Sequence, residues 1–314
     1  MQVVVQTENL RMEFSLGLGR GRMVALDDLT LQVESGEVFG VLGPNGSGKT
    51  TAMKVLTGLC APTSGSAWVL GQPVGNVSVK NEIGFLPEHP YFYEYLTAEE
   101  FLRFYARLFR RGGLVLSKRV DELLELVGLT RQRRTRLQHF SKGMLQRIGI
   151  AQALINDPRL VLLDEPMSGL DPVGRREVRD IILQLRDQGK TVFFNSHILP
   201  DVEMICDRVA ILMEGRLLAM GPVRELVGSI SVRSVEVELE SVSSTEIAVV
   251  ERMAEKVVVM KNYLIAVLPD MASVDEILRL ANVHGWRLRA MTPRRASLEE
   301  IFLQEVSKHH HEIR

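Results

Sequence analysis

A glycine-rich run at residues 43–51 is the clearest chemical signal in the chain. It follows an apolar stretch at 38–42 and has the glycine, lysine and hydroxyl spacing of a phosphate-binding loop that opens a helix. Glycines let the backbone wrap around phosphates, and the helix adds amide groups and a favourable dipole. Lys49 is expected to reach the β- and γ-phosphates, and the Thr50 hydroxyl to bind Mg²⁺. The predicted nucleotide-binding residues are Gly43, Pro44, Asn45, Gly46, Ser47, Gly48, Lys49, Thr50 and Thr51.

Two adjacent carboxylates, Asp164 and Glu165, end a second apolar run at 160–164. Strand ends of α/β sheets face the ligand crevice, so acids placed there can take part in chemistry. Asp164 is expected to hold Mg²⁺ through water, and Glu165 to accept a proton from the attacking water. A strand that merely ends in polar residues is the alternative, and the phosphate-binding loop upstream argues against it.

A serine and a glycine, Ser141 and Gly143, stand at the start of a predicted helix that runs toward residue 156. In isolation this pattern indicates an ordinary helix N-cap. Its position one helix before the carboxylate strand favours a functional interpretation.

Five motifs in this order resemble the ATP-binding cassette (ABC) family over about residues 9–221. They are the phosphate-binding loop, the Ser-x-Gly signature, Asp164-Glu165, Ser168-Gly169-Leu170-Asp171 and Asn195-Ser196-His197. The resemblance implies that ATP and Mg²⁺ bind in a head-to-tail dimer of two copies. Each ATP would then lie between one phosphate-binding loop and the signature helix of the other copy.

The same resemblance assigns roles to individual side chains. Ser141 and Gly143 would contact the γ-phosphate of the partner's nucleotide, and His197 would contact the γ-phosphate as the family's switch histidine. Asp171 would lie in a loop that crosses the dimer interface, although before Pro172 it also fits a simple N-cap. Phe14 matches the aromatic on which adenine stacks, and a core phenylalanine is the alternative.

The chain departs from the commonest family pattern at two places. The signature has Phe140, Lys142 and Met144 where Leu, Gly and Gln are usual. Glu88 stands where a glutamine normally contacts Mg²⁺ and the lytic water, so it is a further candidate metal ligand and catalytic residue. Both variations look like those of exporter subunits encoded apart from their membrane permease.

An aromatic-rich stretch at 91–96 joins the nucleotide motifs to the helical region. In the family this neighbourhood forms the groove that receives a short helix of the membrane subunit, and buried aromatic anchors suit such an interface. Phe92 or Tyr93 is the expected groove residue, and packing within the helical region is the alternative.

The periodicity predicts two domains. Residues 1–227 alternate β-branched runs with helices, as in a P-loop NTPase α/β sheet core, with an inserted helical subdomain at about 97–156. Residues 228–314 follow the order strand, helix, strand, strand, helix, strand, helix, which predicts a small ferredoxin-like α+β accessory domain. Capping boxes mark three helix starts in it, at Ser243/Glu246, Ser273/Glu276 and Ser297/Glu300. It shows no catalytic constellation, which favours binding or regulation.

Composition narrows the remaining function classes. The formal net charge of −1 predicts no overall attraction to nucleic acid, so no nucleic-acid partner is expected. The 2 cysteines, at 60 and 206, lack the spacing of a disulfide framework or metal site and fit a reducing cytosol. The first residues lack a signal peptide, and no run approaches the ~20 apolar residues that span a bilayer.

These patterns together predict the ATP-hydrolysing subunit of an ABC transporter that drives export through a separate integral membrane permease. Its expected location is cytoplasmic, held at the inner face of the cell membrane by that permease. The alternative is an ABC-type ATPase with a signalling or mechanical role on a membrane or ribosomal partner. Glu165 and His197 argue against a nucleotide-binding module without turnover.

Overall fold

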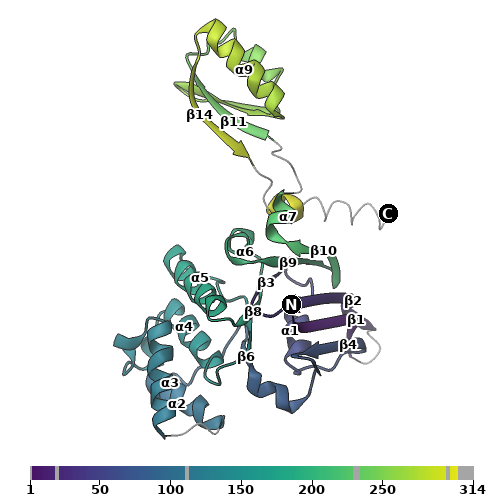
Figure 1. The fold of residues 1–314 in the computed structure, drawn as a ribbon, viewed down its shortest axis with the longest axis vertical. Coiled ribbons are helices and arrows are strands. Elements are labelled where there is room, and N and C mark those ends of the chain that lie inside the picture. Colours follow the sequence, from purple (N-terminus) through teal and green to yellow (C-terminus); the bar gives the residue numbers. More distant parts are fainter. Residues whose placement is uncertain (1, 18–20, 110–112, 229–233, 295–297, 303–314) are drawn as a thin grey trace. The chain divides into compact units, whose positions relative to one another are not determined.

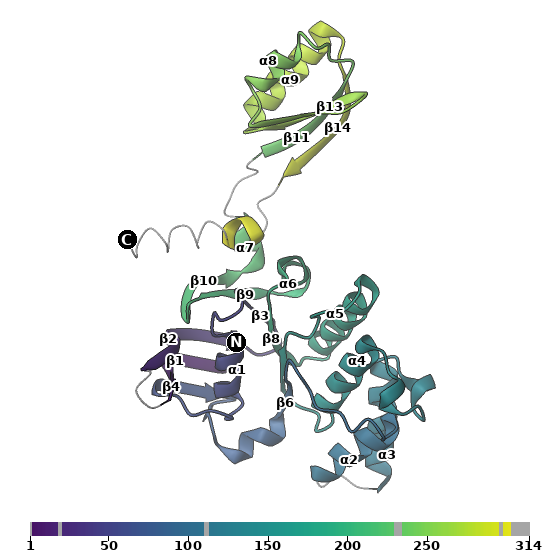
Figure 2. The same cartoon turned by 180° about the vertical axis from the view of Figure 1, so that it is seen from behind.

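The computed structural model describes residues 2–17, 21–109, 113–228, 234–294 and 298–302. The chain divides into two compact units, one ending at Val223 and the other beginning at Arg224. Figure 1 and Figure 2 show the folds from opposite sides.

The first unit contains a six-stranded sheet whose strands are ordered β10-β9-β3-β8-β7-β6. Five strands run parallel and β10 is the antiparallel edge. Every residue of β3, β7 and β8 is buried, as expected for parallel strands covered on both faces. The strands span Val38–Leu42 (β3), Ile83–Leu86 (β6), Leu160–Asp164 (β7), Thr191–Ser196 (β8), Arg208–Met213 (β9) and Arg216–Pro222 (β10).

A four-stranded antiparallel sheet, ordered β2-β1-β4-β5, lies on the other side of helix α1 (Figure 1). The apolar core of this half lies between the two sheets and around α1, where mainly valines and leucines of α1, β1, β2, β3, β4, β7 and β9 meet, together with Phe193 of β8. The elements span Val3–Ser15 (β1), Arg22–Glu34 (β2), Ser64–Val69 (β4), Gln72–Pro73 (β5) and Lys49–Leu56 (α1).

The opposite face of the six-stranded sheet carries α5 (Pro172–Asp187) and α6 (Leu199–Ile205), with a helical subdomain beside them (Figure 2). Thr97 and Glu100 form the predicted capping box at its start. The subdomain lies between β6 and β7 in the chain and consists of α2 (Ala98–Leu108), α3 (Gly113–Leu126), short 3-10 turns at Thr130–Gln132 and Leu137–His139, and α4 (Lys142–Ala153). A further 3-10 turn, at Val77–Glu82, precedes β6.

The second unit begins within α7 (Val223–Gly228) and has the predicted βαββαβ order. Its sheet is antiparallel, ordered β12-β13-β11-β14, which is the strand arrangement of a ferredoxin-like domain. The α/β and α+β fold classes predicted from the sequence are confirmed. The elements span Ser234–Glu240 (β11), Ile247–Glu251 (α8), Lys256–Val259 (β12), Tyr263–Leu268 (β13), Met271–His284 (α9) and Arg287–Arg294 (β14).

The predicted capping boxes of this unit agree with the structure at one helix and disagree at another. Glu246 reaches back to the Ser243 amide as predicted, although α8 itself begins one turn later, at Ile247. The prediction for Ser273 is wrong, because Asp270 caps α9 by accepting a hydrogen bond from the Ser273 amide. An aspartate one turn earlier gives the same amide an acceptor and lengthens the helix. Ser297 lies outside the described residues.

Candidate nucleotide site

The predicted chemical residues gather at one edge of the six-stranded sheet. The phosphate-binding loop follows β3, Glu88 comes two residues after β6, and Asp164 ends β7. His197 comes directly after β8. Because β3, β8, β7 and β6 are adjacent and parallel, their carboxyl ends meet at the same edge. The fold therefore brings together segments that are more than one hundred residues apart in the chain.

The phosphate-binding loop is folded tightly against strand β2. Gly48 caps α1 in the left-handed region, with φ of 102°. A methyl group built on Gly48 would lie 2.5 Å from the carbonyl oxygen of Ala25, so only glycine fits here. The loop amides and the first turn of α1 are thereby presented to the cavity in front of them.

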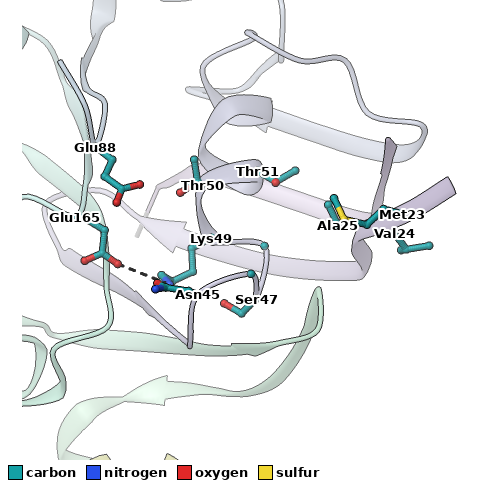
Figure 3. A pocket seen from close by; sticks show the side chains of 12 residues that line it. Met23, Val24, Ala25, Asn45, Ser47, Lys49, Thr50, Thr51, Glu88 and Glu165 are labelled. Atoms are coloured by element: carbon teal, nitrogen blue, oxygen red, sulfur yellow. Dashed lines mark ion pairs between the residues drawn. The ribbon is translucent and has the colours of Figure 1, made fainter. Parts of the chain in front are cut away.

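Lys49 is the buried cation of the site, with 6% of its surface exposed. Its Nζ donates to the carbonyl oxygens of Gly43 (2.8 Å) and Pro44 (3.1 Å) and lies 3.7 Å from Oε1 of Glu165 (Figure 3). Burial lowers the pKa of Lys49, and the carboxylates of Glu165, Asp164 and Glu88 oppose that shift. Two carbonyl oxygens and one carboxylate thus hold the ammonium. These are contacts that phosphate oxygens can replace.

Asp164 is held between two strands and helix α1. Its Oδ1 accepts hydrogen bonds from Nδ2 of Asn195 (2.9 Å) and from the Thr50 hydroxyl (3.3 Å). Burial raises the pKa of Asp164, and the nearby charge of Glu88 raises it further. Asn195 is fully buried, and its own Oδ1 has no hydrogen-bond partner within the described chain. The role of Asn195 in holding Asp164 was not predicted from the sequence, which placed it only within a motif.

The donor set suits Mg²⁺, which prefers oxygen ligands in octahedral geometry. Thr50 and Asp164 supply a hydroxyl and a carboxylate that already touch one another, and Glu88 lines the same cavity. The described residues contain no group of three or more His, Cys, Asp or Glu side chains that could hold a metal alone. A Mg²⁺ ion here would complete its coordination with phosphate oxygens and water, as is usual for this ion.

Glu165 and His197 form a hydrogen-bonded pair, and Glu165 lies next to Lys49. The His197 Nδ1 lies 2.8 Å from Oε2 of Glu165, while the other carboxylate oxygen faces Lys49. Glu165 is buried and has φ of 50°, a left-handed conformation that is uncommon for a residue other than glycine. Such backbone strain clusters at functional sites, where the surrounding structure fixes it.

A cavity of about 350 Å³ lies in front of the loop (Figure 3). This volume falls at the lower end of the range for small-molecule sites. The lining has an apolar side formed by three consecutive residues of β2 and a polar side formed by the loop and two carboxylates. The lining residues are Met23, Val24, Ala25, Asn45, Gly46, Ser47, Gly48, Lys49, Thr50, Thr51, Glu88 and Glu165.

The apolar side differs from the one expected from the sequence. Phe14 is not among the lining residues and packs, partly buried, against the core around α1. Met23, which pairs with Phe14 across the β1–β2 ladder, lines the cavity instead, together with Val24 and Ala25. The alternation of β2 could not have indicated this wall, because the first residues of the strand are exposed in succession and not in turn. Contact between Phe14 and a base stays a prediction.

Comparisons with known proteins identify the family of this chain. Residues 26–168 match the family model described as ABC transporter. An ABC transporter ATP-binding protein of Nostoc sp. is 44% identical over 309 residues, covering 97% of this chain and 90% of the relative. The chain belongs to the ABC transporter family, as an ATP-binding subunit.

Two further comparisons agree with this assignment. The bacitracin transport ATP-binding protein BcrA of Enterococcus faecalis is 38% identical, over 72% of this chain and 71% of the relative. A solved dimeric ATP-binding cassette in a post-hydrolysis state, bound to ADP and phosphate, has a TM-score of 0.64 and 25% identity. It covers 70% of this chain and 99% of its own length. ABC ATP-binding subunits bind and hydrolyse ATP, pair with membrane permeases and form dimers.

Three residues predicted for the ABC dimer lie outside the cavity of their own chain. Ser141 caps α4 by accepting a hydrogen bond from the Met144 amide, and Gly143 in the first turn has open space where a side chain would be. Asp171 caps α5 by accepting from the Gly174 amide at 2.7 Å. The signature lysine, Lys142, lies with its ammonium against Gly169.

The aromatic stretch of the cassette is divided between packing and exposure. Phe92 packs on Phe101 with ring centroids 5.6 Å apart, as the alternative interpretation expected. Tyr93 contacts Phe104, while Tyr91 and Tyr95 are 77% and 67% exposed. The sequence did not single out these two tyrosines. No helix among the described residues has the length and apolar composition to cross a membrane.

Proposed function

We propose that this subunit hydrolyses ATP in a head-to-tail dimer and drives export through a separate membrane permease. The observation that carries the proposal is the contact of Lys49 with the Glu165–His197 pair at the phosphate end of the cavity. A buried lysine, a carboxylate and an imidazole in contact form the set that phosphoryl hydrolysis needs: a phosphate clamp, a base and a group that orients the base.

Each group has one task in this proposal. The loop amides and Lys49 bind the phosphates, and Lys49 exchanges its carbonyl contacts for phosphate oxygens. Glu165 accepts the proton of the attacking water, while His197 holds Oε2 and so directs the carboxylate. Thr50 and Asp164 would hold Mg²⁺, and the ion would neutralise charge on the bound phosphates.

Charge supports a divalent cation as part of the site. Glu165, Glu88 and Asp164 surround one lysine, and they leave an excess of negative charge around the phosphate-binding loop. Adding the phosphates of ATP without a cation would increase that excess. A Mg²⁺ ion offsets it, which supports Mg-ATP and not free ATP as the substrate.

The head-to-tail arrangement explains why Ser141 and Gly143 are outside their own cavity. The N-terminus of α4 is capped but sterically open at Gly143, so it can approach an anion on another subunit. Complementation tests this arrangement. Lys49→Ala and Ser141→Arg are each expected to abolish hydrolysis. Mixed, they regenerate one complete site per mixed dimer and restore up to about a quarter of wild-type activity. No recovery in a verified mixed dimer would contradict the arrangement.

The permease is expected to dock on the exposed part of the aromatic stretch. Tyr91, Tyr95 and Leu108 are 77%, 67% and 63% exposed, and Phe104 joins them through Tyr93. Amphipathic aromatic side chains of this kind are enriched at the centres of protein interfaces. BcrA, named as a bacitracin transport ATP-binding protein, supports transport as the process that this subunit drives.

The docking surface can be tested by reconstituting this subunit with the membrane protein that it binds as its permease. Tyr91→Ser with Tyr95→Ser should leave the ATPase rate of the isolated subunit unchanged and remove its stimulation by that membrane protein. Val77→Ser is the matched control, because Val77 is 73% exposed and lies outside the aromatic stretch. Full stimulation of the double variant would place the permease elsewhere.

A further inference from the structure

The tight turn between β9 and β10 touches the phosphate-binding loop from behind the cavity. The amide of Gly215 donates to the carbonyl oxygen of Ser47 (3.1 Å), and the carbonyl oxygen of Gly215 accepts from the amide of Asp27 (2.9 Å). One residue of the turn is therefore hydrogen-bonded both to the loop and to strand β2. These are the two segments that form the polar and the apolar sides of the cavity.

The three segments are packed backbone against backbone. Gly215 has φ of 82°, and a methyl group built on it would lie 2.8 Å from the carbonyl oxygen of Ala25. The corresponding methyl group on Gly48 would lie 2.5 Å from the same oxygen and 3.5 Å from Cα of Gly215. Glu214 also has a left-handed φ, of 49°. Without side chains to yield between them, a shift of the turn must move the loop.

An ion network fixes the turn to the sheet. Arg216, the first residue after the turn, donates from Nε (2.9 Å) and Nη2 (2.6 Å) to Oδ2 of Asp27. Arg11 of strand β1 donates to the other oxygen of Asp27 and pairs with Glu13 at 2.9 Å, and Glu13 in turn pairs with Arg22. The Arg216 hydrogen bonds are the main cause that lowers the pKa of Asp27, which is therefore ionised at neutral pH.

We propose that Arg216 and Asp27 are positioning residues for the nucleotide. Neither lines the cavity, so they touch no part of a ligand that occupies it. They hold the Gly215 turn, and the turn holds the Ser47 carbonyl of the loop against the wall formed by Met23–Ala25. The network thus fixes the separation between the base side and the phosphate side of the site. This inference rests on the proposed use of the cavity as the ATP site.

The network is expected to govern ATP affinity and to leave the chemical step unaffected. Lys49, Glu165 and His197 belong to the far side of the loop and keep their mutual contacts when Arg216 is changed. A looser loop loses binding to phosphates in the ground state and in the transition state alike, which raises KM without lowering kcat. Exposed or half-exposed ion pairs contribute little free energy to the structure that they hold. We therefore expect ATP to bind about threefold to tenfold more weakly when the Arg216–Asp27 pair is removed.

The experiment compares Arg216→Gln, Asp27→Asn and the double variant with the wild type in the full-length chain. Affinity for a fluorescent ATP analogue is measured, together with KM and kcat for Mg-ATP. Arg159→Gln is the matched control, because Arg159 is similarly exposed and its side chain pairs with Glu82 at 3.3 Å, on another part of the sheet. The expected result is weaker binding for both single variants, a double variant no weaker than either, and an unchanged control.

If Arg216 and Asp27 only stabilised the fold, the kinetic and thermal measurements would differ from this expectation. Loss of fold would lower kcat and the melting temperature together, and independent effects would add in the double variant. Arg216→Lys keeps the charge but loses the two-pronged contact, and should fall between Arg216→Gln and the wild type. The inference is overturned if Arg216→Gln binds the analogue as tightly as the wild type does. If the wild type itself fails to bind the analogue, the ATP site and not the network is refuted.

Discussion

Asp164 in the first unit and Glu246 in the second are both hydrogen-bonded carboxylates, yet their pKa values move in opposite directions. Burial raises the pKa of Asp164, because two hydrogen bonds and Lys49 do not fully offset the lost hydration. The pKa of Glu246 falls to about 2, mainly through its hydrogen bonds with the Ser243 hydroxyl and amide and with the indole of Trp286. The surroundings of Asp164 therefore disfavour its charged form, whereas those of Glu246 favour it.

The two units also differ in how many polar side chains they bury. The first buries Lys49, Asp164, Glu165 and Asn195 side by side at the edge of one sheet. Among the described residues of the second unit, the buried polar set contains only Ser234. Burying several charged groups together costs stability, and it persists where the groups serve chemistry. The second unit uses its polar groups as helix caps at the surface, which favours a binding or regulatory role.

Replacing the proposed base gives the largest expected effect. Glu165→Gln keeps the shape and the contact with His197 but cannot accept a proton. Turnover should fall at least ~10²-fold while ATP still binds. Because hydrolysis no longer separates the subunits, the variant should accumulate as an ATP-dependent dimer in size-exclusion chromatography. A variant that hydrolyses ATP at nearly the wild-type rate would remove Glu165 from this role.

Glu88 should show an intermediate effect, because it lines the cavity without contacting the loop. Glu88→Ala removes a carboxylate close to Asp164 and Lys49, and this loss should weaken the positioning of metal and water even though the pKa of Asp164 falls. We expect the ATP affinity of Glu88→Ala to stay within about tenfold, or 1.4 kcal/mol, of the wild-type affinity, because Lys49 and the loop amides still hold the phosphates. Hydrolysis, and its stimulation by the permease, should fall further than binding does.

The matched control for that experiment is Asp180→Ala. Asp180 is an exposed carboxylate on helix α5, outside the aromatic stretch, and does not line the cavity. Binding isotherms and ATPase rates with and without the reconstituted membrane partner decide the outcome. Unchanged stimulation of Glu88→Ala would make Glu88 only a loop residue.

Removal of the second unit should have a small effect on the site. All cavity residues belong to the first unit, which has its own cores between and beside the sheets. A chain that ends after Val227 should therefore stay folded and bind ATP within about threefold of the full-length affinity. Circular dichroism and equilibrium binding test this. An insoluble product, or one that does not bind nucleotide, would show that the boundary or the independence of the unit is wrong.

The parts of the site that sequence could predict are those set by local chemistry. The loop, the carboxylates after β7 and the histidine after β8 are contiguous motifs, and parallel strand order brings them together. Three features depend on contacts across the fold and were not predictable in this way. They are the Asn195 bond to Asp164, the apolar wall of β2 and the Gly215 contact with the loop.

Helix caps also show that a local sequence pattern cannot predict contacts with residues elsewhere in the fold. The spacing Ser-x-x-Glu occurs at Ser243 and at Ser273, but only the first pair forms the predicted contact. At Ser273 the neighbouring Asp270 offers a charged acceptor to the same amide and displaces the start of the helix. Glu246 gains two further partners, Trp286 and His284, which are distant in the chain. A local pattern predicts that a cap exists, and tertiary contacts select which residue forms it.

Glu246 allows a test in which the second unit changes and the nucleotide site does not. The pKa of Glu246 in the folded unit is about 2, below the ordinary value of 4.5, so ionised Glu246 stabilises the fold above pH 4.5. That contribution is lost as the pH falls from 4.5 through 2. Glu246→Gln should lower the melting temperature of this unit by on the order of a few degrees at neutral pH. The difference from the wild type should shrink through the same pH range, and the ATPase rate at pH 7 should stay unchanged.

The measurement can be confined to the second unit by using its tryptophan. The chain has 2 tryptophans, and Trp68→Phe leaves Trp286, which donates to Glu246 at 3.1 Å, as the single reporter. Glu251→Gln on the exposed side of α8 controls for the loss of one negative charge in the same unit. If both glutamate variants melt alike at every pH, the hydrogen bonds to Glu246 do not stabilise this unit. If instead Glu246→Gln slows ATP hydrolysis, the second unit affects the nucleotide site. The contrast between polar groups that serve chemistry in the first unit and polar groups that only stabilise the second unit is then wrong.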